Sequence, residues 1–132
     1  MEVIIGVKAV IMKNGKILLM KRSDDYGYAT GWWDIPGGRT IAGEEPEEGL
    51  KREVMEETGL ELKNIIRPLD ARTVFKNDEK QIVRITFLCE ADGDVKLSGE
   101  HTEHDWFDLK DLNVELKDDA LGDVLSNLKQ EK

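Results

Sequence analysis

One segment of the chain constrains the rest most strongly: residues 43–60 (GEEPEEGLKREVMEETGL), which carry the signals of a single bounded helix and contain seven glutamates in eighteen residues. Pro46 suits the first turn of a helix, where its missing N–H is not needed, and Gly59 suits the position just past the end. We therefore predict a helix over residues 46–58. Its apolar side consists of Leu50, Val54 and Met55 and must pack against another layer.

The segments around this helix have the composition of strands. Two apolar runs, 3–12 and 16–22, flank Asn14-Gly15, which is typical of a hairpin with a type I′ turn. Further strands are predicted at 32–35, 62–69, 71–75 and 81–91, and a short one opens at Trp106 after an acidic loop, 98–105. A second amphipathic helix is predicted at 118–129. This order predicts one α/β domain, a mixed sheet with helices packed against it.

The totals limit the classes of partner. The 132 residues carry a formal net charge of −9, which argues against binding duplex nucleic acid or an anionic membrane by bulk charge. A small phosphorylated substrate stays compatible, since a divalent cation can bridge acidic protein and acidic ligand. The single cysteine, Cys89, indicates a reducing, cytoplasmic setting. No apolar run approaches the roughly 20 residues of a membrane span.

Three glutamates of the predicted helix share one face. Glu53, Glu56 and Glu57 stand at positions i, i+3 and i+4, a spacing that brings their carboxylates together. Without a cation these groups repel one another, whereas with Mg²⁺ or Mn²⁺ they form a site of hard oxygen ligands. Arg52 lies one turn before Glu56 and can pair with it. A solvated acidic face is the alternative interpretation of the same residues.

The spacing of these residues extends into the preceding glycine loop, Trp33-x-x-Pro36-Gly37-Gly38. From Gly38 the sequence follows G-x5-E-x7-R-E-V-x-E-E-x-G-L, which resembles the Nudix box, G-x5-E-x7-R-E-U-x-E-E-x-G-U with U a bulky aliphatic residue. All nine fixed positions agree: Gly38, Glu44, Arg52, Glu53, Val54, Glu56, Glu57, Gly59 and Leu60. The resemblance implies the Nudix fold, an α/β/α sandwich with a mixed central sheet, as one domain over residues 1–132.

The same resemblance implies a metal-dependent hydrolase that cleaves a pyrophosphate bond in a nucleoside diphosphate joined to a group X. Under it, Glu53, Glu56 and Glu57 would bind Mg²⁺ or Mn²⁺ together with the backbone carbonyl of Gly37. A further glutamate often comes from a loop shortly before a tryptophan. Glu100 is our first choice for this extra ligand or general base.

Two other glutamates compete for the role of base. Glu103 lies three residues before Trp106, and Glu53 is the rival within the box. The remaining box residues receive supporting roles from the resemblance. Arg52 and Glu44 would orient the carboxylates, Val54 and Leu60 would anchor the helix to the sheet, and Gly38 and Gly59 would permit loop geometry that a Cβ would obstruct.

Several residues outside the box are candidates for substrate binding. Lys21 or Arg22, at the end of a predicted strand, could reach the phosphates, or form an edge-strand charge pair. One of the adjacent Trp32 and Trp33 could stack on a base while the other packs in the core, and we assign stacking to Trp33. Arg84 could face the ligand or form a structural salt bridge. Within the box, Gly38 is the fifth candidate for substrate binding.

Two more pairs of residues need a role. Tyr26 and Tyr28 lie in a loop that could cover the pocket. The two histidines, His101 and His104, are predicted to be solvated because they carry no zinc-like ligand set.

The group X is the least determined part of the prediction. The compact length resembles MutT-like members of the family, which convert nucleoside triphosphates to monophosphates and pyrophosphate. A proline often accompanies ADP-ribose hydrolysis some fifteen residues past the box, but Phe75 stands there. Fifteen residues after Trp106, where some members read the base with an asparagine, stands Leu121.

Two alternatives stay open: an ADP-ribose or nucleotide-sugar hydrolase, and a Nudix-fold module that binds a nucleotide without cleaving it. Homodimers are common in the family, and the sequence leaves the oligomeric state and the number of metal ions open.

Overall fold

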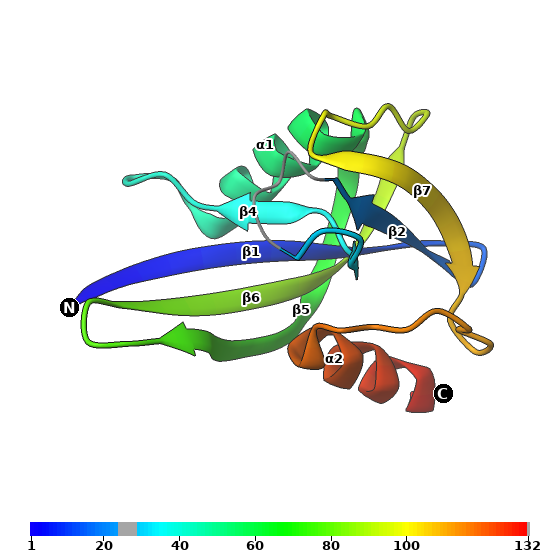
Figure 1. The fold of residues 1–132 in the computed structure, drawn as a ribbon. Coiled ribbons are helices and arrows are strands. Elements are labelled where there is room, and N and C mark those ends of the chain that lie inside the picture. Colours follow the sequence, from blue (N-terminus) through cyan, green and yellow to red (C-terminus); the bar gives the residue numbers. More distant parts are fainter. Residues whose placement is uncertain (24–28, 132) are drawn as a thin grey trace.

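The computed structural model describes residues 1–23 and 29–131, so the predicted cover of Tyr26 and Tyr28 lies outside the described residues. Figure 1 shows a twisted sheet with one helix on each side. The elements follow in the order β1 (Glu2–Lys13), β2 (Lys16–Arg22), β3 (Trp33–Asp34), β4 (Gly37–Arg39), α1 (Pro46–Thr58), β5 (Glu61–Lys76), β6 (Lys80–Asp92), β7 (His101–Asp108) and α2 (Asp119–Gln130).

The sheet is mixed, as predicted. Its strands lie in the order β3-β2-β1-β6-β5, with β4 paired to β1 and β7 paired to β2. Strands β1 and β6 run parallel, from the pair Glu2 and Lys80 to the pair Ile11 and Cys89, and the other pairs are antiparallel. The fold class predicted from the sequence is therefore confirmed.

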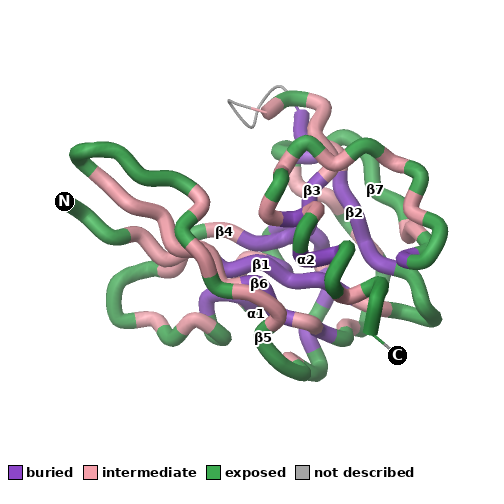
Figure 2. Tube along the Cα trace, turned by 90° about the horizontal axis from the view of Figure 1, so that it is seen from below, coloured by how far each residue is buried: buried purple, intermediate pink, exposed green. Residues whose placement is uncertain are grey.

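A hydrophobic core lies on each side of the sheet. Leu50 and Val54 of α1 are fully buried against one face, together with Val7, Ala9, Ile11, Leu18, Met20 and Cys89. Leu121, Val124 and Leu125 of α2 pack on the other face against Val10, Ile17 and Leu19. Figure 2 shows buried stretches of chain in β1 and β2 between these layers. The two amphipathic helices and the alternating strand residues thus make a three-layer domain.

Local signals located the turn and the helices well. Asn14 and Gly15 have φ values of 54° and 77°, as a type I′ turn requires, and Met12 pairs with Ile17 across the hairpin. Helix α1 has the predicted bounds, and α2 begins and ends one residue later than predicted. Gly59 ends α1 in the left-handed conformation, with its N–H donated to the Met55 carbonyl. The prediction that Met55 packs inward is wrong, because it is 47% exposed.

Three strand predictions need correction. The two strands predicted at 62–69 and 71–75 are one strand, β5, whose register shifts at four places along β6. The predicted acidic loop at 98–105 is mostly strand β7, which pairs along β2. The segment Gly37–Arg39, for which no strand was predicted, forms the short strand β4 against β1. No helix in the described part of the chain has both the length and the apolar character that crossing a membrane requires.

Candidate active site

The glycine loop packs directly on the carboxylates of α1. Gly37 has a φ of +153°, and a Cβ at this position would lie 2.0 Å from the Val7 carbonyl oxygen, so only glycine fits. Its N–H donates a 3.0 Å hydrogen bond to Oε2 of Glu57. At Gly38 a Cβ would lie 2.6 Å from the carboxyl carbon of Glu53. The loop and the helix face are therefore built as one unit.

Arg52 holds the carboxylates of this unit in place. Its guanidinium makes a bidentate contact with Glu44, with Nε donating to Oε2 at 2.9 Å and Nη2 to Oε1 at 3.1 Å. Its Nη1 donates to Glu53 at 2.9 Å and lies 3.5 Å from a carboxylate oxygen of Glu56. The hydrogen bond from Arg52 lowers the pKa of Glu44 to about 2. This geometry supports the orienting role predicted for Arg52 and Glu44.

The three carboxylates of the box differ in depth. The side chain of Glu56 is 59% exposed and that of Glu53 is 18% exposed, whereas Glu57 is buried. Burial raises the pKa of Glu57 to about 8, the charge of Lys8 opposes this rise, and the charge of Glu53 adds to it. Among the described residues, no three acidic, histidine or cysteine side chains are clustered tightly enough to hold a metal ion as they stand.

The anchoring residues of the box lie where the resemblance places them. Val54 is fully buried beneath α1, and Leu60, just past Gly59, is 2% exposed. The hydroxyl of Thr58 closes this end of the helix by donating to the Val54 carbonyl at 2.7 Å and accepting the Leu60 N–H at 3.0 Å. The end of α1 is thereby fixed to the sheet.

The two candidate bases of the 98–105 segment lie on the surface in this structure. Glu100 and Glu103 are both exposed, and within the described residues no ion pair or hydrogen bond joins either carboxylate to α1. Glu103 pairs with Lys21 on β2 at 3.7 Å. Two other residues of the segment meet α1: the Ser98 N–H donates to the Glu57 carbonyl at 3.1 Å, and Nε2 of His101 lies 4.0 Å from Oε1 of Glu57.

The prediction that both histidines are solvated is therefore wrong for His101, which is 6% exposed, and right for His104. Burial lowers the pKa of His101 to about 4, so its ring is neutral at pH 7. Sequence reasoning missed it because it treated the segment as a loop. Its burial follows from pairing β7 with β2, where His101 lies opposite Arg22.

A cleft of about 780 Å³ opens beside the glycine loop, on the α2 side of the sheet. Four of the five predicted substrate-binding residues line it: Arg22, Trp33, Gly38 and Arg84. Lys21 does not line it. Trp33 packs edge-on against Phe107, with ring centroids 5.2 Å apart. This contact places Trp33 at the border between the cleft and the core. Trp32 lines the cleft as well, so the prediction that only one of the two tryptophans reaches it is wrong.

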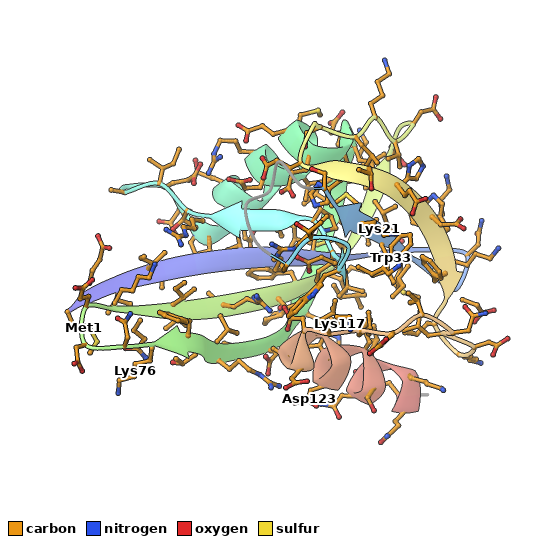
Figure 3. All side chains as sticks on the ribbon, viewed as in Figure 1. Met1, Lys21, Trp33, Lys76, Lys117 and Asp123 are labelled. Atoms are coloured by element: carbon orange, nitrogen blue, oxygen red, sulfur yellow. The ribbon has the colours of Figure 1, made fainter. Side chains whose placement is uncertain are left out.

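The far wall of the cleft is polar and comes from three elements. Arg72, Thr73 and Phe75 belong to β5, Lys80, Ile82 and Arg84 to β6, and residues 117–120 to the start of α2. Lys117 precedes α2 where this helix meets the sheet (Figure 3). Arg84 donates to Asp118 at 2.9 Å, which is the structural salt bridge that was one of its two predicted roles. Leu121 lies in the core instead of the cleft.

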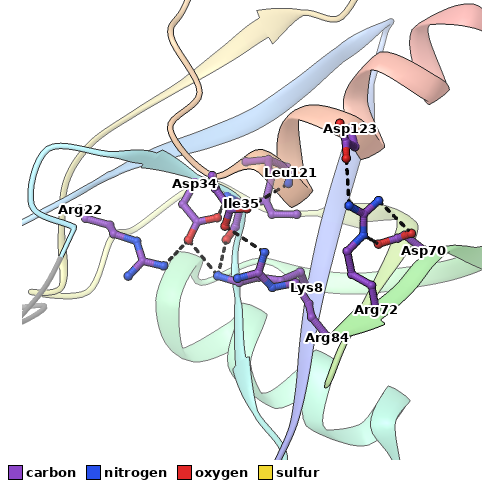
Figure 4. A network of polar contacts seen from close by, with 10 residues as sticks. Lys8, Arg22, Asp34, Ile35, Asp70, Arg72, Arg84, Leu121 and Asp123 are labelled. Carbon is purple, nitrogen blue, oxygen red and sulfur yellow. Dashed lines mark hydrogen bonds and ion pairs between the residues drawn. The ribbon is translucent and has the colours of Figure 1, made fainter. Parts of the chain in front are cut away.

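Arg22 takes part in a buried network that the sequence did not reveal. Its Nη2 lies 2.5 Å from Oδ2 of Asp34, and Lys8 donates to the same oxygen at 2.9 Å (Figure 4). Arg22 is 5% exposed, so the alternative of a surface charge pair is wrong for Arg22, whereas Lys21 does form an exposed pair, with Glu103. These two cations lower the pKa of Asp34 to about 2, although burial alone would raise it. Arg39, at the end of β4, is another cleft residue that the sequence reasoning did not single out.

Comparisons with known proteins agree with this geometry. The family model for the NUDIX domain matches residues 3–128. The nucleoside triphosphatase NudI of Escherichia coli is 34% identical over 113 residues, which cover 78% of this chain and 80% of that protein. A MutT-like protein of Streptomyces ambofaciens is 36% identical over 99 residues, or 74% of this chain, and the matched part spans 58% of its length.

Solved structures extend the likeness to the whole fold. The MutT protein from Methanosarcina mazei Go1 superposes with a TM-score of 0.80 at 33% identity, covering 98% of this chain and 94% of that one. The relatives thus cover most of the chain, and the family model covers residues 3–128, which include the glycine loop and α1. The chain therefore belongs to the NUDIX family of hydrolases.

Proposed function

We propose that this protein hydrolyses a pyrophosphate bond in a nucleoside diphosphate-X substrate, and that a nucleoside triphosphate, giving the monophosphate and pyrophosphate, is its first substrate class. One observation carries the proposal: Gly38 lines the cleft and also contacts the carboxylate of Glu53. The acidic face of α1 therefore borders the space in which a ligand of nucleotide size fits.

The residues present fit a hard divalent cation, Mg²⁺ or Mn²⁺. The carboxylates and the Gly37 carbonyl supply oxygen donors, and the charge of Glu53 raises the pKa of its neighbour Glu57, a repulsion that a cation would offset. Glu53, Glu56 and Glu57 would hold the ion, with the Gly37 carbonyl and Glu100 as further ligands. A bound ion would lower the pKa of a water molecule and offset negative charge on the diphosphate.

The protein's own groups supply position and proton transfer. Arg52 fixes the direction of the Glu53 carboxylate through its 2.9 Å bond. Glu53, Glu100 and Glu103 stay the candidates for the base that removes a proton from the attacking water. The contact between Glu53 and Gly38 favours Glu53, whereas Glu100 would have to turn from its exposed position. Most of the rate enhancement in such transfers comes from positioning and charge stabilisation.

The cleft would bind the nucleoside side of the substrate. Trp33 offers an aromatic surface for a base, and Arg22 and Arg39 lie at the end of the cleft near the glycine loop. The relative NudI is named a nucleoside triphosphatase and is aligned over 78% of this chain, which supports a triphosphate substrate.

A second candidate, ADP-ribose or a nucleotide sugar, is favoured by the far wall of the cleft. Arg72, Lys80 and Lys117 line it beyond the position of a base, where a larger X with further polar groups would lie. A module that binds nucleotides without cleaving them is disfavoured, since binding alone does not require the complete set of Glu53, Glu56 and Glu57.

The test is a substrate panel with identification of the products. Nucleoside triphosphates, ADP-ribose, nucleotide sugars and dinucleoside polyphosphates are incubated with Mg²⁺ or Mn²⁺, and the products are separated by ion exchange. We expect monophosphate and pyrophosphate from at least one triphosphate. Release of inorganic phosphate from a freshly bound triphosphate would place the cut at another bond, and saturable binding with no turnover would support the non-catalytic module.

A further inference from the structure

Strand β1 carries a buried lysine. Lys8 stands in the apolar run from Val3 to Met12 and is only 7% exposed. Its Nζ donates to Oδ2 of Asp34 at 2.9 Å and to the carbonyl of Ile35 at 3.2 Å (Figure 4). Lysines are almost never buried without a partner, so this position has a demanding geometry.

The partners of Lys8 belong to one turn, the segment 34–37 that enters the glycine loop. Lys8 lies opposite Gly37 in the pairing of β1 with β4. Its Cα and Cδ atoms would each lie 2.8 Å from a Cβ at Gly37, so the lysine stem packs directly under the glycine. Ala9, the next residue on β1, donates its N–H to the Pro36 carbonyl at 2.9 Å. Strand β1 therefore contacts each residue of this turn, from Asp34 to Gly37.

The segment 34–37 also contacts the acidic helix α1. The N–H of Gly37 donates to Glu57 at 3.0 Å, which makes the turn the direct neighbour of the buried carboxylate. The positive charge of Lys8 also acts on Glu57, lowering its pKa against the effect of burial. A shift of the turn would therefore move the Gly37 backbone and the Glu57 carboxylate relative to each other.

The other end of the network reaches the cleft. Asp34 accepts from Lys8 and Arg22 at one oxygen and from the Ile35 N–H at the other, at 2.8 Å. Arg22 and Asp34 both line the cleft. Lys8 also lines the cleft itself, and the Asp34 carboxylate joins it to Arg22 in the same wall, while Gly37 joins it to Glu57 on the helix face.

We propose that Lys8 is a positioning residue, which holds the turn from Asp34 to Gly37 so that the Gly37 backbone and Glu57 are set for a divalent cation and Arg22 is set in the cleft. This inference rests on the proposed function, because it assumes that the ion is held by Gly37 and Glu57. Groups that orient metal ligands typically contribute about 10- to 100-fold to metal affinity or activity.

The experiment compares Lys8→Met with Val10→Ala. Methionine keeps the length of the stem and removes the ammonium. Val10 is buried on the same strand in the core beneath α2, so Val10→Ala controls for loss of stability alone. Mn²⁺ affinity is measured from the electron paramagnetic resonance signal of free Mn²⁺, and kcat and KM are measured with the substrate found in the panel. We expect Lys8→Met to weaken Mn²⁺ binding about tenfold or more and to lower kcat, with Val10→Ala binding Mn²⁺ as the wild type does.

A second variant covers the case in which Lys8→Met does not fold. Asp34→Asn leaves Lys8 in place, keeps the shape of its partner and weakens the same link, so it is expected to weaken Mn²⁺ binding in the same direction. Wild-type Mn²⁺ affinity in a folded Lys8→Met or Asp34→Asn protein would overturn the inference. So would a rise in KM alone, because that result would make Lys8 a direct substrate contact.

The failure of the proposed function gives a different pattern. If the wild type binds no Mn²⁺, or if Glu57→Gln binds it as tightly as the wild type, the assignment of the ion to α1 is wrong. Tight binding by the wild type, weak binding by Glu57→Gln and unchanged binding by Lys8→Met would overturn only the role of Lys8.

Discussion

Glu57 shows how far one residue can depart from the behaviour of its type. The spacing of Glu53, Glu56 and Glu57 predicted a shared helix face, and the structure has that face. The depth of each carboxylate was not predictable, since it depends on β4 and β7 covering one side of α1. Glu57, with the Gly37 N–H on one oxygen and His101 4.0 Å from the other, is buried, and Glu56 one position earlier is exposed.

The raised pKa of Glu57 predicts how stability depends on pH in the metal-free protein. The folded carboxyl keeps its proton up to about pH 8, whereas the unfolded one loses it near 4.5. The contribution of Glu57 to the free energy of unfolding is therefore fully present below about pH 4.5 and is lost as the pH rises through 8. Urea denaturation with EDTA should show the Glu57→Gln variant losing less stability than the wild type in this range.

The range from about pH 6.5 to 8 is the most informative one. His101, with its pKa lowered to about 4, acts in the opposite direction and only below about 6.5, the ordinary value for histidine. Equal slopes for the wild type and Glu57→Gln above pH 6.5 would contradict the account of this carboxyl.

The general base is tested by single substitutions on β7 and just before it. We expect Glu100→Gln to lower kcat if Glu100 turns toward α1 as the extra ligand or base. Glu103 pairs with Lys21 on the surface, so Glu103→Gln should change kcat by less than about twofold, and a large loss would instead make Glu103 the base. Equal small losses in the two variants would assign the base to Glu53. Rates are measured with the same substrate at saturating Mg²⁺.

Among the elements, those with strong local signals were predicted best. Asn14-Gly15 and the boundaries of α1 depend on neighbouring residues, so the sequence contains them. Strand β5 continues through Pro68 because it is an edge strand with register shifts, where a missing N–H is tolerated. Strand β7 forms on acidic residues because it pairs with β2, a contact between segments some 85 residues apart that no local pattern shows.

The packing face of α1 can be tested directly. Leu50 is fully buried, so Leu50→Ala should lower the free energy of unfolding by about 2–5 kcal/mol through lost contacts and the cavity that remains. Met55, 47% exposed on the same helix, is the control, and Met55→Ala should change stability by about 0.5 kcal/mol or less. Similar losses in both variants would contradict the orientation of the helix. Urea unfolding at one pH measures both.

For the whole molecule, the sequence predicted the family and the acidic helix but not how the cleft is assembled. Arg22, Asp34 and Lys8 come from β2, β3 and β1 and meet only when these strands pair. The wall formed by β5, β6 and the start of α2 depends likewise on the packing of the complete sheet. A linear motif describes the chemistry of one helix, whereas the group X is selected by surfaces that only the folded chain brings together.

Metal binding should also stabilise the whole molecule. A ligand that binds only the folded state at about 100 times its dissociation constant adds about 2.7 kcal/mol to the free energy of unfolding. Millimolar Mg²⁺ or Mn²⁺ should therefore raise Tm by several degrees in the wild type and by less in Glu56→Gln. An equal rise in both proteins would place the stabilising ion elsewhere. Calorimetry with and without EDTA measures the shift.

The central claim is that the carboxylates on α1 carry the hydrolysis. It is tested most directly by the turnover of Glu56→Gln and Glu57→Gln on the preferred substrate, with circular dichroism confirming that both variants are folded. We expect each substitution to lower kcat by about a hundredfold or more while the fold stays intact. Near-normal turnover in either folded variant would contradict it.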